Sequence, residues 1–221
     1  IAAAIDWAKT LKGKGDEVSK LVEKGKSQFA GPEIMGKTLG IVGLGAIGVK
    51  VANTALSLGM KVVGYDPFLS VNAALGMKPG VTVVKTLAEL YSVSDYITLH
   101  LPYNSDTKDT VCADSISRMK KGVRILNFAR GELVNTKDII AALASGDVSA
   151  YITDFPNAKT SAMEGVIATP HLGASTEESE DNCAVMAADE LKDYLENGNI
   201  KNSVNYPACD MGICQVAGRI G

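Results

Sequence analysis

Three glycines and one aspartate give the clearest chemical signal in the sequence. Gly43, Gly45 and Gly48 follow an apolar, β-branched run, and an amphipathic helical pattern begins among them. In this spacing the first glycine permits a sharp turn, the second lets the backbone approach a pyrophosphate, and the third lets the helix lie close to the strand. Asp66 ends the next apolar run, about twenty residues on, where a carboxylate accepts hydrogen bonds from a ribose 2′-hydroxyl. These residues predict a dinucleotide site.

The residues after Asp66 indicate which dinucleotide binds. Pro67 and Phe68 follow it, and no arginine stands beside it. A 2′-phosphate would be repelled by the carboxylate and would lack a cationic partner. We therefore predict that the cofactor is NAD rather than NADP.

Composition limits the class of partner. The 221 residues are 46% hydrophobic and 21% charged, with a net charge of −3. These values are typical of a globular protein and give no electrostatic footprint for nucleic acid or an acidic membrane. Since the sequence shows neither a membrane-spanning run nor a basic, then apolar leader, we expect a cytoplasmic protein with a small-molecule partner. The cysteines have no zinc spacing, so we expect free thiols and no metal; they are Cys112, Cys183, Cys209 and Cys214.

The elements that position these residues alternate along the chain. Helices are expected over 1–12, within 9–26, over 47–56, 86–91, 113–119, 135–144 and 176–197, and strands over 40–42, 61–65, 81–84, 95–100, 122–127, 149–153 and 165–168. Such alternation implies right-handed crossovers. The predicted fold is an α/β, doubly wound parallel sheet of the Rossmann type. The last helix is expected to begin with a capping box from Ser175 to Glu178.

Four polar side chains follow strands of this predicted sheet. His100, Arg130, Asp154 and His171 all lie in loops at carboxyl ends, and the chain has no other histidine. Ligands bind at that edge in doubly wound sheets. We therefore expect these four residues to surround the bound ligands.

Several stretches together resemble one family. They are 43–48, 65–67, 99–102, 121–131 and 169–176, within residues 36–200. In this order they are similar to the D-isomer-specific 2-hydroxyacid dehydrogenases, and most similar to members that act on 3-phosphoglycerate, in a lysine-bearing subgroup with a C-terminal ACT-type domain.

The resemblance implies roles for individual residues. Arg130 would hold the substrate carboxylate and polarise its carbonyl, because its fixed fork matches a carboxylate bidentately. His171 would take the hydroxyl proton as hydride leaves for the nicotinamide. Asp154 would bind the nicotinamide carboxamide and ribose side, and His100 either touches the cofactor or only ends its strand. The implied cofactor-binding residues are Gly43, Gly45, Ala46, Ile47, Gly48, Asp66, His100, Leu101, Pro102, Phe128, Ala129, Arg130, Asp154, His171, Gly173 and Ala174.

One departure from the family concerns the partner of His171. The family usually has a glutamate five residues after the aspartate, paired with the histidine. Counted from Asp154 this position is Lys159, and a register on Phe155 gives Ala158. Because a lysine cannot accept the imidazole N–H, either another acid such as Glu164 replaces the glutamate or Lys159 shares the acid–base role.

The family also suggests how the chain is organised. We expect a dinucleotide-binding domain with connecting helices over 1–205, and a linker with the start of an ACT-type domain over 206–221, in which 212–220 resemble a first strand. The family's substrate domain precedes the dinucleotide-binding part, so we expect this chain to be part of a two- or three-domain protein that forms a homodimer or higher homo-oligomer.

The implied reaction is NAD-dependent oxidation of D-3-phosphoglycerate to 3-phosphohydroxypyruvate, in serine synthesis. Glyoxylate/hydroxypyruvate reductase and D-lactate dehydrogenase activities stay open, because the cofactor half carries little information on the substrate. A non-catalytic NAD(H)-sensing module, like the C-terminal-binding corepressors, is the alternative outside enzymes.

Overall fold

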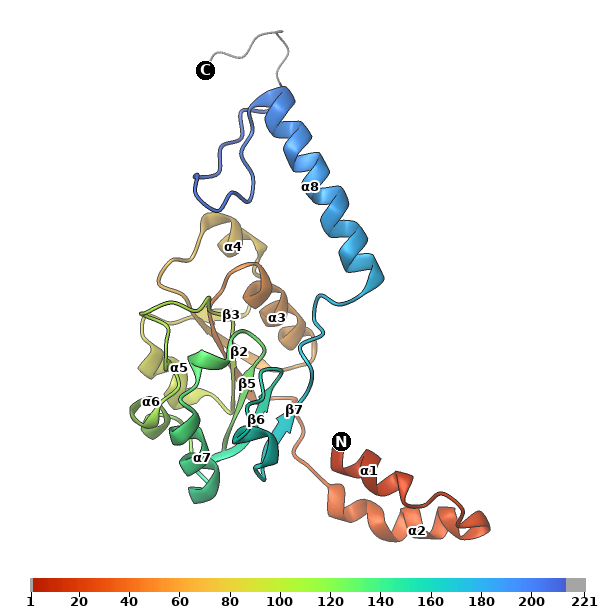
Figure 1. Cartoon of the computed structure of the whole chain (residues 1–221). Coiled ribbons are helices and arrows are strands. Elements are labelled where there is room, and N and C mark those ends of the chain that lie inside the picture. Colours follow the sequence, from red (N-terminus) through yellow and green to blue (C-terminus); the bar gives the residue numbers. More distant parts are fainter. Residues whose placement is uncertain (1, 214–221) are drawn as a thin grey trace. The chain divides into compact units, whose positions relative to one another are not determined.

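The computed structural model describes residues 2–213 (Figure 1). It divides into two compact units, Ile1–His171 and Leu172–Gly221, and each is described here by itself. The sequence-based domain boundary at residue 205 stays a prediction. Residues 214–220 of the expected ACT-type strand lie outside the described residues.

The first unit is built on a seven-stranded parallel sheet in the order β3-β2-β1-β4-β5-β6-β7. The strands are β1 (Thr38–Val42), β2 (Lys61–Tyr65), β3 (Val81–Val83), β4 (Tyr96–Leu99), β5 (Val123–Asn127), β6 (Val148–Thr153) and β7 (Val166–Ala168). From β1 the chain first proceeds outward to β3, then returns to the other side of β1 with β4. The adjacent carboxyl ends of β1 and β4 therefore form the switch point at which such sheets bind ligands.

Helices connect these strands, as Figure 1 shows. They are α3 (Ala46–Ser57), α4 (Val71–Gly76), α5 (Leu87–Val93), α6 (Ala113–Ser117) and α7 (Thr136–Ser145), with 3-10 turns η3 (Gly131–Leu133) and η4 (Thr160–Ala162). Ile41 of β1 packs in one apolar cluster with residues of α3, whereas its neighbour Val42 packs in a second cluster with residues of α5. Since successive side chains of a strand point to opposite faces, the sheet is covered on both sides. The predicted doubly wound fold is confirmed.

Local signals explain most helix ends. Asn135 caps α7 as predicted, accepting hydrogen bonds from the N–H groups of Lys137 and Asp138, and Gly146 ends this helix at φ +77°. The short helix α4 has no counterpart among the predicted elements; Ser70 caps it by accepting from the Ala73 N–H.

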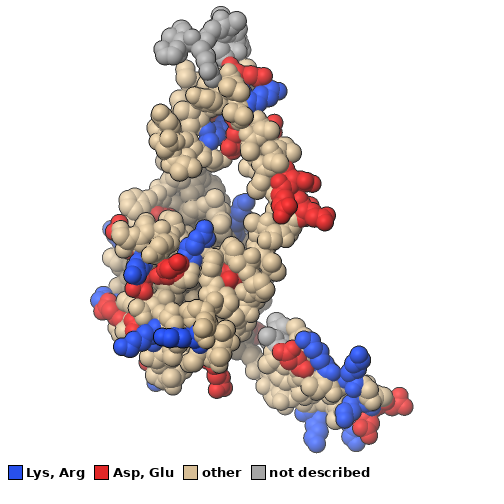
Figure 2. All heavy atoms as spheres, viewed as in Figure 1, with Lys and Arg blue, Asp and Glu red and all other residues tan. Residues whose placement is uncertain are grey.

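Residues 2–29 form a helical hairpin. It consists of α1 (Ala2–Lys9), η1 (Gly15–Glu17), α2 (Val18–Gly25) and η2 (Lys26–Phe29). The rings of Trp7 and Phe29 meet with centroids 5.2 Å apart. Lysines and acids alternate over its surface (Figure 2), as expected for a solvated helix face.

The second unit contains α8 (Glu177–Asn197) and the loop that follows. The capping prediction was wrong by one residue: the Thr176 hydroxyl, not that of Ser175, accepts from the backbone N–H three residues on. A β-branched residue suits the extended backbone that an N-cap requires. Acidic residues gather at the start of α8 (Figure 2), where they complement the helix dipole.

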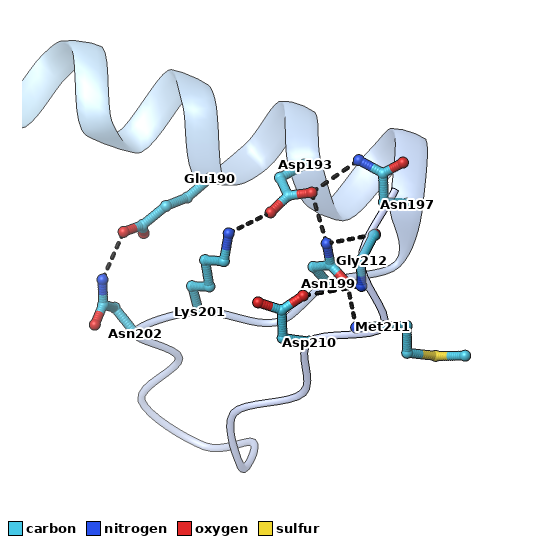
Figure 3. A network of polar contacts seen from close by, with 9 residues as sticks. All are labelled: Glu190, Asp193, Asn197, Asn199, Lys201, Asn202, Asp210, Met211 and Gly212. Carbon is cyan, nitrogen blue, oxygen red and sulfur yellow. Dashed lines mark hydrogen bonds and ion pairs between the residues drawn. The ribbon is translucent and has the colours of Figure 1, made fainter. Parts of the chain in front are cut away.

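A polar network fastens the loop to the end of α8 (Figure 3). The Asp193 carboxylate accepts hydrogen bonds from Asn197, Asn199 and Lys201, with the lysine at 2.7 Å. These bonds lower the pKa of Asp193 to about 2. Asn199 extends the network by donating to the Gly212 carbonyl at 3.0 Å.

Two further findings concern residues 2–213 alone. No helix among them is long and apolar enough to cross a membrane. Cys112, Cys183 and Cys209 carry free thiols, and Cys214 lies outside this part of the chain.

Candidate functional site

The glycine turn at the switch point has the geometry that its spacing predicts. Gly43 adopts φ +97°, and a Cβ there would come within 2.5 Å of the His100 carbonyl oxygen. A Cβ on Gly48 would overlap the carbonyl oxygen of Gly43, so the helix could not lie this close to the strand. Gly45 caps α3 and faces open space. The first N–H groups of α3 are therefore accessible to a phosphate.

Asp66 is anchored beside this turn. One of its carboxylate oxygens accepts the Leu44 N–H at 2.9 Å, and the other accepts the Phe68 N–H at 2.8 Å. Each oxygen keeps a further lone pair for another donor. The carboxylate thus links the glycine turn to the end of β2, and its contact with a ribose hydroxyl stays a prediction.

A pocket of about 580 Å³ lies at the carboxyl ends of these strands. Seven of the predicted cofactor residues line it, together with Tyr103 and Glu132, which the sequence reasoning missed. The seven are Ile47, His100, Leu101, Pro102, Phe128, Ala129 and Arg130.

His100 lines this pocket as well as ending its strand. Its Nε2 lies 3.1 Å from the Thr98 hydroxyl. Burial lowers the pKa of His100, so the ring is neutral at physiological pH. It offers shape and a neutral polar group to a ligand rather than a charge.

Asn127 positions Arg130, a role that the sequence reasoning missed. This fully buried side chain ends β5. Its amide donates to the Arg130 carbonyl at 2.9 Å, and its oxygen accepts the Ala129 N–H at 3.2 Å. The only signal in the sequence was an asparagine at the end of an apolar strand.

Two of the three predicted catalytic residues, Arg130 and His171, pack against the same aromatic ring. The guanidinium carbon of Arg130 lies 5.9 Å from the ring centroid of Phe155. The same ring meets the His171 imidazole with centroids 4.5 Å apart and planes at 40°. Phe155 is held in turn by its N–H, which donates to the buried Thr153 hydroxyl at 3.0 Å.

His171 is paired with Asp154. The Nδ1 of the histidine lies 2.7 Å from Oδ2 of the aspartate. Only 9% of the Asp154 side chain is exposed, against 51% for His171. The second oxygen of Asp154, Oδ1, is buried and has no hydrogen-bond partner within the described residues. Nε2 of the histidine is thus left for a ligand, and Oδ1 for a further donor.

Four other predicted residues lie outside this cluster. Lys159 and Glu164 are exposed, and the described residues show no hydrogen bond or ion pair from either side chain. Gly173 and Ala174 belong to the second unit, and their cofactor role stays a prediction.

The sheet order, the glycine turn at the switch point and the acid at the end of β2 define an NAD(P)-type dinucleotide-binding domain. Comparison with known families then gives the particular one. Residues 1–173 match the model of the D-isomer specific 2-hydroxyacid dehydrogenase, NAD binding domain. The chain belongs to this family, as the sequence resemblance suggested, and the expected cofactor, NAD, is confirmed for it.

Curated relatives within the family are enzymes named D-3-phosphoglycerate dehydrogenase. The Synechocystis enzyme is 36% identical over 200 residues, which cover 86% of this chain and 36% of the relative. The Bacillus subtilis enzyme is 36% identical over 212 residues, or 90% of this chain and 40% of the relative. The chain thus spans less than half the length of these relatives.

Solved structures of two dehydrogenases are similar to this chain in both sequence and fold. The NAD⁺-bound 3-phosphoglycerate dehydrogenase of Entamoeba histolytica is 34% identical, with a TM-score of 0.68 over 80% of this chain and 57% of that one. The Aquifex aeolicus D-lactate dehydrogenase, complexed with NAD and lactic acid, is 29% identical, with a TM-score of 0.67 over 88% and 64%.

Proposed function

We propose that this protein is an NAD-dependent dehydrogenase that oxidises D-3-phosphoglycerate to 3-phosphohydroxypyruvate. The observation that carries the reaction type is the cluster of Arg130, Phe155, His171 and Asp154, whose members follow the carboxyl ends of β5, β6 and β7. The choice of substrate is supported by the names of the curated relatives.

The site residues fit the cofactor. Gly45 leaves open space for a pyrophosphate, and the buried Oδ1 of Asp154 lacks a donor that a carboxamide NH₂ would supply. When bound, NAD⁺ accepts the hydride from C2 of the hydroxy acid.

Each residue of the cluster then has a distinct task. The Arg130 fork holds the substrate carboxylate, and its charge polarises the C2 oxygen. Nε2 of His171 takes the proton of the C2 hydroxyl as the hydride leaves, and returns it in the reverse direction. Asp154 accepts the Nδ1 proton, which fixes the tautomer with the Nε2 lone pair available.

Asp154 is our candidate for the acid that takes the place of the missing glutamate. Asp154 is the acid that lies within hydrogen-bond distance of His171, whereas Glu164 is exposed and shows no hydrogen bond or ion pair to His171 within the described residues. One carboxylate would therefore orient the histidine through Oδ2 and receive the cofactor through Oδ1. Lys159 stays a second candidate for the acid–base role.

The test is NADH oxidation by the full-length protein with 3-phosphohydroxypyruvate, beside hydroxypyruvate, glyoxylate and pyruvate. We expect the phosphorylated substrate to be preferred. His171→Ala and Arg130→Ala should each lower turnover by about 10²–10⁴-fold, with NADH affinity nearly intact, and Lys159→Ala is the matched comparison.

The outcomes separate the alternatives. Preference for another keto acid would keep the mechanism and change the substrate. Absence of turnover with all four, with NADH binding retained, would favour the NAD(H)-sensing module. A larger loss of turnover in Lys159→Ala than in His171→Ala would assign the acid–base role to the lysine.

Two finer expectations remain proposals, the first from the family resemblance and the second from the sequence pattern. These are a homodimer or higher homo-oligomer and a cytoplasmic location. Light scattering after gel filtration tests the first, and fractionation tests the second.

A further inference from the structure

A second pocket lies at the amino-terminal edge of the sheet. It has a volume of about 240 Å³ and is lined by residues that precede or begin β1, β4 and β5, with Pro32. Since all strands are parallel, this edge is opposite to the one that carries the glycine turn. The pocket is therefore separate from the proposed cofactor site.

The charges around this pocket are mostly positive. Its lining contains Lys37, Lys120, Lys121 and Arg124 against a single acid, Asp95. Both oxygens of that acid are engaged, one by the Thr38 N–H at 2.8 Å and the other by Lys120 Nζ at 3.0 Å. The lining keeps a surplus of three positive charges.

Asp95 is a structural anion rather than a free counter-charge. Burial acts to raise its pKa, but the hydrogen bonds from Thr38 and Lys120 and the charges of Lys120 and Lys37 outweigh this and lower it. The carboxylate is thus ionised at neutral pH and joins the starts of β1 and β5. It cannot neutralise the remaining cations.

Arg124 is the most informative of these cations. It is half-buried and lies opposite Tyr96 in the β4–β5 pairing, with its guanidinium carbon 5.4 Å from the tyrosine ring centroid. Within the described residues its guanidinium makes no hydrogen bond, whereas Arg118 binds both oxygens of Asp114. A planar fork held on an aromatic ring, with its donors unused, is suited to a bidentate anion.

We propose that this pocket binds a small polyanion carrying at least two negative charges, either a phosphate monoester or a polycarboxylate. The pocket volume suits an ion of this size. The Arg124 fork would bind two anionic oxygens, and Lys37 and Lys121, whose ammonium groups form no ion pair within residues 2–213, would neutralise the rest. The site does not depend on the proposed dehydrogenase activity.

The experiment measures anion binding to the chain by titration calorimetry. Inorganic phosphate and citrate are the probes, and saturating NADH is present so that the glycine turn is already occupied. We expect saturable binding of at least one probe, and the tighter one indicates which source of anion the site recognises. Chloride and acetate at equal ionic strength should not compete.

The variants decide whether the binding belongs to this pocket. Lys121 is exposed, so Lys121→Gln should leave the fold intact. We expect it to bind the anion about tenfold more weakly, as for one lost charge-assisted hydrogen bond. Arg124→Lys keeps the charge but loses the fork, and should weaken binding similarly. Lys61→Gln is the matched control, because Lys61 begins β2 at the same edge without lining the pocket.

The result can overturn the proposal in two ways. Absence of saturable binding by both probes would exclude an anion site. Equal affinity in wild type, Lys121→Gln and Arg124→Lys would place the binding elsewhere.

Discussion

The substitution Asp154→Asn tests the central pair of the proposed site. The side chains have nearly the same shape, but the amide carries no charge. The bond from His171 Nδ1 to Asp154 Oδ2 is 2.7 Å long, as expected for a charge-assisted hydrogen bond. Such a bond contributes about 1.5–3 kcal/mol, against about 0.5–1.5 kcal/mol for a neutral one.

The expected loss follows from these values. Removing the charge alone costs about 1–1.5 kcal/mol, and losing the bond entirely costs up to about 3 kcal/mol. At about 1.4 kcal/mol per factor of ten, kcat should fall roughly 10- to 100-fold. Because half of the His171 side chain is exposed, solvent screening favours the lower part of this range.

Stability should change in the opposite sense to turnover. Asp154 buries a carboxylate oxygen without a partner, and a neutral amide is less costly to bury. The melting temperature of Asp154→Asn should therefore equal or exceed that of the wild type. Steady-state kinetics and a thermal melt on the same preparation measure both quantities.

A matched control uses the other end of the same strand. Asp147 precedes β6, as Asp154 follows it, and accepts a hydrogen bond from Ser145 at 2.6 Å. Asp147→Asn should leave kcat unchanged. A kcat for Asp154→Asn within twofold of the wild type would refute the view that Asp154 orients His171.

Further predictions address other parts of the chain. Gly48→Ala should destabilise the protein by about 1–3 kcal/mol, because the new Cβ would overlap the carbonyl oxygen of Gly43. Gly45→Ala should have little effect, because a Cβ there meets no atom of the described residues beyond its chain neighbours within 4 Å. The free energies of unfolding of both variants can be compared by chemical denaturation. Asp66→Ala should weaken NAD binding and narrow the preference for NAD over NADP, as measured by fluorescence titration with both reduced cofactors. An unchanged preference would contradict the assignment of Asp66 to the ribose hydroxyl. Phe155→Leu should lower kcat/KM about tenfold, because Arg130 and His171 would pack more loosely against the smaller side chain, and Phe155→Tyr should retain most of the wild-type kcat/KM. The pKa of Asp193 is lowered to about 2, so its hydrogen bonds should stabilise the loop after α8 fully above about pH 4 and lose this effect toward pH 2. Amide hydrogen exchange in that loop, corrected for the intrinsic pH dependence, should therefore show less protection as the pH falls through this range.

The fold was predictable because local signals and global topology agree in this chain. The apolar runs, the glycine turn and the Asn135 cap each indicate the element that forms. The short helix α4 was missed because six residues show little periodicity, and its only clear signal is the Ser70 cap. The shift of the α8 cap from Ser175 to Thr176 is of the same kind, since two adjacent hydroxyls both satisfy the sequence pattern.

The site was predictable in its residue types but not in its contacts. The glycines, Asp66 and the loop residues of the pocket could be placed because each follows a strand. The pairing of Asp154 with His171 spans seventeen residues and depends on how β6 and β7 align. The roles of Asn127 and Phe155 depend on three-dimensional packing in the same way, and no residue spacing in the sequence predicts them.

Under the proposed function, the alignment of β6 and β7 is what lets an aspartate take the place of the family's glutamate. Asp154 follows directly after Thr153, whose hydroxyl is buried and accepts the Phe155 N–H, and whose carbonyl accepts the Thr169 N–H at 3.0 Å. The sheet therefore fixes the backbone on both sides of the carboxylate and brings the chain before His171 against it. A glutamate five residues later would have to reach the histidine from a loop, with a longer side chain and more rotamer freedom to lose. Placing the acid at the end of the strand needs only a short side chain, and it leaves the second carboxylate oxygen buried without a partner within the described residues, which under the proposed function is the acceptor for the cofactor's carboxamide.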